Sequence, residues 1–559
     1  MKSVAENSVE REEEIDKLFN FRPVFFAATF LCLGIFFAYL RVLKGVSAWW
    51  SLLLLPFVLP PFCFCSSRQR LKRTAIAVGM LALCFIIGYG LLVARLRDFS
   101  DTKQYNGELP VVGRVVEKTD YGVYTRFTLT DLYIDGNREK GKLAAYLPTA
   151  LCEGVALSDE VVIEGHVRTD TGYWSEYGFR AKDIGESVRF VMNGEFCVVS
   201  GHSFDLFLSV YTRLENRVHT GMHESSATVT LAVLTGDTSG IETDLLENMR
   251  MGGIAHIFAV SGLHIGALYA FCLTAFRKTP LRKLPKPARF VLLSALLIFY
   301  SGVCGFTPSV LRATTICLLS YAAILLGVHI DFLEIVGGAE VFLLLRSPTA
   351  LFEVGFQLTF LACLGIALLK RPVKGLIDGG AGWIRKVFPK KLTEEQRVAL
   401  AQGDSLPPTL GEKVFQSISS VLSASIAAQI ATAPVLMYAF GFLSGWSLLL
   451  NFFFVPVIGC VFSALLLCVV LACLLPATVA SALLYLPQLL WTVALLVFEL
   501  MDFSKFALTG IRLTGWSMFC YYAGCTFLSD KWNVPKGVRR VYASLCFLIF
   551  TATVWIANG

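Results

Sequence analysis

The sequence is poor in charged residues and in histidine, and each shortage argues against a class of protein. Only 16% of the 559 residues are charged, against about 25% in an ordinary soluble domain. The seven histidines include no His-x-His or His-Glu-x-x-His spacing, and none follows His329. This pattern argues against a zinc site with several His ligands. We therefore expect no metal and no cofactor.

Two familiar motifs are also missing. Gly236 and Gly240 bracket a polar turn, but no Lys-Ser/Thr pair follows the second glycine, so a phosphate-binding loop is not predicted there. Residues 1–20 carry the acidic run Glu12–Glu14 instead of a basic region, which argues against a secretory signal. The chain is not predicted to bind ATP or to be cleaved after its first apolar segment.

Hydrophobic residues are abundant, at 55% of the chain, and they gather in long segments. A membrane span needs about 20 mainly apolar residues. We expect a polytopic α-helical membrane protein with about 11–13 spans, the exact count depending on whether Pro456 and Gly459 break the segment 446–475. The candidate segments are 24–40, 48–64, 74–95, 254–276, 288–305, 310–328, 332–346, 348–369, 415–439, 446–475, 480–500, 514–529 and 541–557.

One soluble segment, 97–200, interrupts the apolar pattern after the first three spans in 1–96. Its residues alternate between apolar and polar in about five short runs, as in Val111–Val116 and Thr125–Leu129. Such strands indicate a small β-barrel, and the oligonucleotide-binding type is one option. The segment is acidic, with 12 Lys and Arg against 17 Asp and Glu, a net charge of −5. The next stretch, 201–252, is predicted to form amphipathic helices at the membrane interface.

Basic residues predict the orientation of the chain. They concentrate in the connecting segments 66–73, 277–289, 370–413 and 531–540. Because positively charged loops stay in the cytoplasm, we expect a cytoplasmic N-terminus and an extracytoplasmic 97–200 segment. Cys152 and Cys197 are the only cysteines in that segment. An oxidising compartment favours a disulfide between them, and two buried free thiols are the alternative.

A histidine motif lies in the first span after 252. Ser261 and His264 are one helical turn apart, a spacing that suits a nucleophile and a base. No acid lies nearby in the sequence to orient the histidine, which favours a hydrogen-bonded residue on a packing helix. Gly262 and Gly266 form a small-xxx-small face, and such faces let helices approach closely.

A second motif places an arginine within a span. Thr307 is a predicted N-cap and Pro308 a first helical residue, with Ser309 following and Arg312 one turn inside. A helix N-terminus with an arginine suits a phosphate. The alternative is a structural ion pair inside the bundle, for which the available acids are Glu334, Glu340 and Glu353.

Three amide side chains lie in later apolar helices, namely Gln357, Gln429 and Asn451. Polar groups at this depth usually face the interior of the helix bundle. They either bond between helices or line a hydrated conduit.

Four motifs, in this order, resemble the ComEC family of competence proteins. They are Leu234–Gly266, Gly305–Arg312, Phe356–Leu361 and Ala428–Pro434. The resemblance implies a multi-pass channel in the bacterial cytoplasmic membrane that passes single-stranded DNA during transformation. It implies that 253–559 is the competence-type transmembrane domain, with 370–413 as a cytoplasmic loop. Many members carry a further metallo-β-lactamase-like nuclease domain, which we expect this form to lack.

The resemblance also assigns roles and partners. The residues expected to line the channel and contact DNA are Ser261, His264, Thr307, Ser309, Arg312, Gln357, Gln429 and Asn451. We expect no enzyme activity, so that a DNA receptor and a separate motor or nuclease act with the chain, beside membrane lipid. The aromatic residues of 97–200 suit either a base-stacking platform or a barrel core. Two other functions stay open, an ion-coupled or small-solute transporter and an intramembrane Ser/His hydrolase.

Overall fold

The computed structural model describes residues 22–47, 68–387 and 410–558, apart from positions 153, 176–177, 239, 259, 329, 501–502 and 531–533. The chain divides into two compact units. The sheet-bearing unit comprises Pro23–Thr220 and Ala275–Phe356, and the helical unit includes Gly221–Thr274 and Gln357–Gly559. The predicted span 48–64 lies outside the described residues.

The sheet-bearing unit combines one β-sheet with long apolar helices. These are α2 (Pro23–Lys44), α5 (Arg68–Ser100), α7 (Leu206–Gly221), α12 (Lys286–Val303), α13 (Pro308–Leu326) and α14 (Phe332–Arg346). The N-terminus of α2 is held by α14, because Glu334 accepts hydrogen bonds from the backbone N–H groups of Val24 (2.9 Å) and Phe25 (3.2 Å). A carboxylate at this position satisfies donors that the helix itself leaves free.

Helices α2 and α5 cross with their backbones in contact. A Cβ atom at Gly34 would collide with the carbonyl oxygen of Phe85, and one at Gly88 would collide with that of Leu31. Two facing glycines therefore allow a close approach that any side chain would prevent.

We expect Gly88→Leu to destabilise this crossing, since overpacking costs about 1–3 kcal/mol or more. Gly90→Leu is the matched control, because a Cβ atom at Gly90 would meet no atom within 4 Å. The measurement is the fraction of monodisperse protein that survives heating in detergent. Equal losses for the two variants would contradict the assignment.

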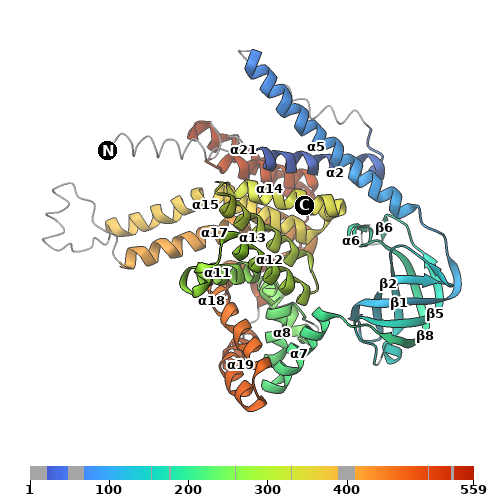
Figure 1. Ribbon diagram of the computed structural model, residues 1–559. Helices are drawn as coiled ribbons and strands as arrows, with labels where there is room; N and C mark the ends of the chain where they lie inside the picture. The colour runs from blue at the N-terminus through green and yellow to red at the C-terminus, as the bar shows by residue number, and fades with distance from the viewer. Residues whose placement is uncertain are drawn as a thin grey trace. The chain divides into compact units, whose positions relative to one another are not determined.

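The sheet lies between α5 and α7 in the chain. Its long strands are β1 (Asn106–Asp120), β2 (Tyr124–Ile134), β4 (Lys142–Pro148), β5 (Asp159–Thr169) and β8 (Val188–His202), with the short β3 (Asn137–Arg138) beside β2. Figure 1 labels β1, β2, β5 and β8 of this sheet. The pairings run β1–β5–β8–β4–β2 and return from β2 to β1. Only the β4–β8 pairing in this ring is parallel. The expected alternating strands are thus present in a sheet whose pairings close on themselves.

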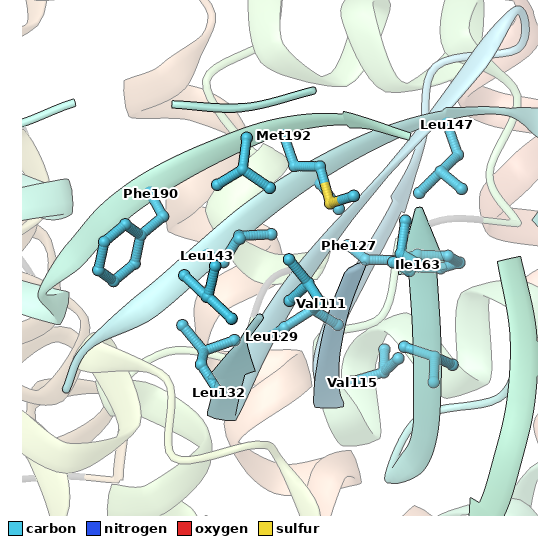
Figure 2. Close-up of a cluster of buried hydrophobic side chains, with 14 of the residues drawn as sticks. Val111, Val115, Phe127, Leu129, Leu132, Leu143, Leu147, Ile163, Phe190 and Met192 are labelled. Atoms are coloured by element: carbon cyan, nitrogen blue, oxygen red, sulfur yellow. The ribbon is translucent and has the colours of Figure 1, made fainter. Parts of the chain in front are cut away.

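Alternate residues of these strands form one hydrophobic core. Figure 2 shows Val111, Phe127, Ile163 and Met192 among the side chains that meet inside the sheet. The neighbouring residues in each strand, such as Val112 and Val162, point outward and are more exposed. The two-residue period of the strands therefore separates an apolar interior from an outer face.

The predicted disulfide is not confirmed, because Cys152 and Cys197 are both free thiols in this structure. Cys152 is part of the sheet core, and Cys197 packs against that core. Burial raises the pKa of the Cys152 thiol, and it raises the pKa of Cys197 to about 11. The structure therefore has two free thiols, with Cys152 buried and Cys197 half-buried.

The sheet is fastened to helices of its own unit. Arg95 of α5 donates to the carbonyl oxygen of Gly185 (2.7 Å) and to Ser187 Oγ (2.9 Å), and Arg189 pairs with Asp98. A cluster of aromatic rings adds a second attachment, formed by Tyr39 of α2, Trp174, Phe179 and Phe352.

The helical unit contains α8 (Glu224–Thr235), α9 (Thr243–Met251), α10 (Ala255–Phe258), α17 (Leu410–Phe440), α18 (Ser447–Leu474), α19 (Ala477–Leu500), α20 (Gly515–Leu528), α21 (Lys536–Asn558) and most of α11 (Gly262–Lys278) and α15 (Val354–Val387). Helix α8 differs from the amphipathic interfacial helix expected in 201–252. Most of its residues are buried, polar Thr230 among them, because the helix packs against α19 and α10.

Within the described residues, seven helices are long and apolar enough to cross a membrane. They are α2, Thr74–Ser100 of α5, α12, α13, Phe415–Phe440 of α17, Ala477–Leu496 of α19 and α21. Other predicted spans are helical too, but α11, α14 and α20 have only 17, 15 and 14 residues. The 446–475 segment forms one helix, α18, without a break at Pro456 or Gly459.

The cytoplasmic loop expected at 370–413 is partly helical. Helix α15 continues through Pro372 to Val387, so the segment from 370 to 387 extends the preceding helix. Asp378 of this extension accepts a hydrogen bond from Ser419 of α17 (2.7 Å). The predicted span ended at residue 369, where the basic residues begin. Charged residues can nevertheless continue a helix beyond its apolar part. Residues 388–409 lie outside the described chain.

Candidate nucleic-acid interface

A hollow of about 520 Å³ lies against the outer face of the sheet. Strands β2, β4, β5 and β8 and the segment between β5 and β8 form its walls. The lining residues are Arg126, Ala144, Tyr146, Arg168, Asp170, Trp174, Ser175, Arg180, Asp183, Val188, Val191 and Asn193. Strand register explains the arrangement, because Arg126 is paired with Tyr146, and Tyr146 with Asn193.

The charge of this hollow is opposite to that of its domain. It contains three arginines and two aspartates, whereas residues 97–200 carry a net charge of −5. Arg180 is paired with Asp170 (2.8 Å) and Asp183 (3.0 Å). Arg126 has a buried Nε atom that finds no hydrogen-bond partner among the described residues. The hollow thus offers cationic groups to an anion, although the domain as a whole repels one.

Three exposed or half-buried tyrosines continue the hollow along β2 and β4. The rings of Tyr121 and Tyr124 are stacked with centroids 4.9 Å apart, and Tyr124 lies 5.9 Å from Tyr146. The other aromatic residues of the segment have different roles. Phe127 is in the core, and Trp174 packs on Tyr39 and under the ammonium group of Lys44. Exposed stacked rings beside arginines suit nucleic-acid bases and phosphates.

A second polar cluster lies inside the helical unit. Gln429 of α17 donates from Nε2 to Ser447 Oγ of α18 (2.8 Å), and Ser447 donates to the carbonyl oxygen of Ser444 (3.0 Å). Asn451 follows Ser447 by one turn, and its Oδ1 atom is buried without a partner among the described residues. Two of the predicted amides therefore belong to one polar line between α17 and α18.

Sequence analysis missed the serines of this line. Ser447 precedes Asn451 by four residues, the spacing that places two side chains on one helix face. Gly253 packs closely against Ser447, because a Cβ atom at Gly253 would lie 2.5 Å from Ser447 Cβ. The short α10 that follows carries His256, which is exposed.

Ser261 and His264 form a helix cap. The Ser261 hydroxyl accepts from the Leu263 N–H (3.3 Å), and His264 Nδ1 accepts from the Ser261 N–H (3.0 Å) and lies 3.1 Å from its Oγ. His264 is fully buried, with its ring edge-on to Phe462. The burial and these bonds favour the hydrogen-bonded residue of a packing helix, because the cap satisfies N–H groups that begin α11. The channel-lining role of Ser261 and His264 stays a prediction.

The expected close helix approach at Gly262 and Gly266 is not found among the described residues. Gly262 is exposed, and a Cβ atom at Gly266 would meet nothing within 4 Å. In the helical unit such an approach occurs instead at Gly365 of α15, where a Cβ atom would collide with Ala427 and Ala431 of α17.

Helix α13 begins as predicted, with Thr307 at the N-cap and Pro308 as the first helical residue. Thr307 makes no capping hydrogen bond through its side chain, and Ser309 is half-buried. Arg312 is only 5% exposed. Among the three candidate acids, Glu353 is the one that interacts electrostatically with its guanidinium group. The other two candidate acids face α2, Glu334 at its N-terminus and Glu340 at Cys32. This environment favours the structural alternative for Arg312.

We expect Arg312→Met to lower the amount of folded protein, because it removes the positive charge that acts on half-buried Glu353. The loss of one partner of a fully buried pair costs about 3–5 kcal/mol, which is an upper bound here. Arg312→Lys should recover part of the loss, since it keeps the charge without the forked geometry. Exposed Arg540→Met is the control, and the measurement is the folded fraction in detergent. Normal folding of Arg312→Met with lost activity would return Arg312 to the lining of a conduit.

The chain is similar to a known protein family. The model of the family described as "Competence protein" matches residues 233–533, more than half of the chain. The chain belongs to the competence protein family. ComE operon protein 3 of Bacillus subtilis (strain 168) is 24% identical over 259 residues. That alignment covers 46% of this chain and 26% of the relative, so the chain matches about a quarter of the relative's length. No solved structure matches.

The competence-family match contains the polar line of Gln429, Ser447 and Asn451. It also contains Arg312 and Gln357, which lies half-buried near the start of α15. The sheet and its hollow lie before residue 233, outside the matched segment. The two candidate sites therefore have different support, one from family membership and geometry and the other from geometry alone.

Proposed function

We propose that this competence-family protein is a channel for single-stranded DNA in the cytoplasmic membrane of a bacterium. The polar line of Gln429, Ser447 and Asn451 carries the proposal, because it lies between packed apolar helices inside the family-matched segment. Polar groups at such a place are costly unless they serve a pathway or a bond between helices. Exposed His256 and the unpartnered oxygen of Asn451 favour a pathway.

The sheet supports the same function as an extracytoplasmic receiver of the strand. We infer an oligonucleotide-binding-type barrel, because five long strands pair in a closed ring and the third and fifth of them are parallel. The hollow supplies arginines for phosphates, and the tyrosines supply faces for bases. Single-stranded DNA fits this combination better than a small solute, since it presents both groups repeatedly.

The proposed orientation places the N-terminus in the cytoplasm and the sheet outside. Val123 at the β1–β2 turn and Leu376 on α15 are exposed positions for testing it. A membrane-impermeant maleimide should label Val123→Cys in intact cells and Leu376→Cys only after permeabilisation. The opposite pattern would exclude the sheet as the first contact of incoming DNA.

Uptake of labelled single-stranded DNA by a deletion strain tests the channel directly. We expect Gln429→Leu to reduce uptake at least several-fold, because it removes the bond to Ser447 and makes the polar line apolar. Ser481→Ala is the control, since its exposed hydroxyl bonds only within α19. Wild-type levels of uptake without the protein would refute the channel, and uptake of a small solute in its place would favour a transporter.

The role of the hollow has its own measurement. Binding to single strands weakens with salt with a slope of about −0.7 per phosphate contact. We expect Arg126→Gln to reduce the magnitude of the slope by roughly that amount. Arg138→Gln should leave it unchanged, because that exposed residue of β3 lies outside the hollow. Identical slopes for both variants and wild type would remove Arg126 from the interface.

We propose no enzymatic step for this chain. His264 is buried in a helix cap and its Nε2 atom has no acid as a partner among the described residues, so the geometry does not favour the hydrolase alternative. Degradation of one strand and the driving force for uptake then belong to separate partners. Strand breakage by purified protein in Mg²⁺ or Mn²⁺ would contradict this division.

A further inference from the structure

A row of apolar side chains crosses the outer face of the sheet away from the hollow. Strand register aligns Tyr133 of β2 with Val112 of β1, Val112 with Val162 of β5, and Val162 with Val198 of β8. Phe196 lies one outward position from Val198 and extends the row. We call these five residues the apolar stripe.

The stripe is open to solvent. Tyr133, Val198 and Phe196 are 41%, 45% and 52% exposed, and Val112 and Val162 are half-buried. Among the described residues, no aromatic ring packs on Tyr133 or Phe196. Single exposed apolar residues are ordinary, but a contiguous row across four strands marks an interaction site.

Acidic residues border the stripe. Glu160 and Glu164 lie on either side of Val162 along β5, and neither forms an ion pair within the described chain. Two arginines also border the stripe, since the strand register places Arg114 opposite Glu160 and Arg138 opposite Tyr133. Both are directed at Asp131, at 2.7 and 4.0 Å, and not at the glutamates. The surface is therefore an apolar row with carboxylates on either side of Val162 that form no ion pair among the described residues.

This charge selects among possible occupants. A nucleic-acid strand or an anionic lipid surface would be repelled by Glu160 and Glu164. A second copy of the chain docked face to face would bring the same acids together. Addition of a strand is also disfavoured, because β1, β5 and β8 are each paired on both sides. What fits is a protein surface with an apolar ridge flanked by lysine or arginine.

We propose that the apolar stripe is the docking surface for a basic extracytoplasmic protein. The proposal goes beyond strand conduction, since docking needs no DNA. The stripe and the hollow share strands β2, β5 and β8 but no residue, because none of the five stripe residues lines the hollow. A protein bound to the stripe therefore leaves the hollow accessible.

Site-specific photo-crosslinking in living cells tests the proposal with the full chain. Benzoylphenylalanine replaces Val198 in one strain and Val123 in a control strain, because Val123 is exposed but lies off the stripe. Cells receive no DNA before irradiation, and adducts are identified by mass spectrometry. We expect one basic protein, with a pI above about 9, at Val198 and not at Val123. Adducts only with lipid, with a second copy or with an acidic protein, or no adduct, would overturn the proposal.

Charge reversal supplies the second test. Glu164→Lys should lower the yield of the Val198 adduct roughly tenfold, since like charges at an interface are unfavourable. Asp101→Lys, an equal charge change at an exposed residue outside the stripe, should leave it unchanged. Lys→Glu exchange at the crosslinked surface of the partner should restore the adduct with Glu164→Lys. An unchanged yield with Glu164→Lys would overturn the charge argument. Adduct formation with failed DNA uptake would leave docking intact and refute the channel.

Discussion

The close backbone approach of α2 and α5 at Gly34 and Gly88 governs the sheet-bearing unit. Helix α5 leads directly into β1, so the crossing of α2 and α5 fixes where the first strand begins. Arg95 and Arg189 then attach the start of β8 to the same helix. Without the two glycines the helices would separate by the width of a side chain, and the bonds at the last turn of α5 would lose their register.

Local signals in the sequence were enough for much of the fold. The start of α13 at Pro308 follows from Thr307 and the fixed φ of proline, and strand alternation located the β-sheet. Predictions that needed the partner surface failed more often. Gly266 shows the same spacing pattern as a packing glycine, but nothing lies beside it, whereas Gly88 faces a backbone.

Charge could not be placed from composition. The net charge of the 97–200 segment is negative, yet strand register collects Arg126 and Arg168 in one hollow and leaves Glu160 and Glu164 elsewhere. His264 illustrates the same limit at another scale. Its spacing from Ser261 suited a nucleophile and a base. In the structure the histidine is buried and bonds at the start of α11. The position of these charges and the burial of His264 both depend on the face of the strand or helix that the residue occupies. Contacts with elements distant in the sequence decide which face is buried.

The closed ring of strand pairings also constrains the order in which the sheet can form during synthesis. Strands β1, β2 and β4 leave the ribosome first, and they can pair as a meander with two edges. Closure needs β8, the last strand made, because it joins β4 in parallel and β5 on its other side. Until then the core around Phe127 and Leu143 lacks Phe190 and Met192. The interval between β4 and β8 is therefore the stage at which the nascent chain is most exposed to aggregation and proteolysis.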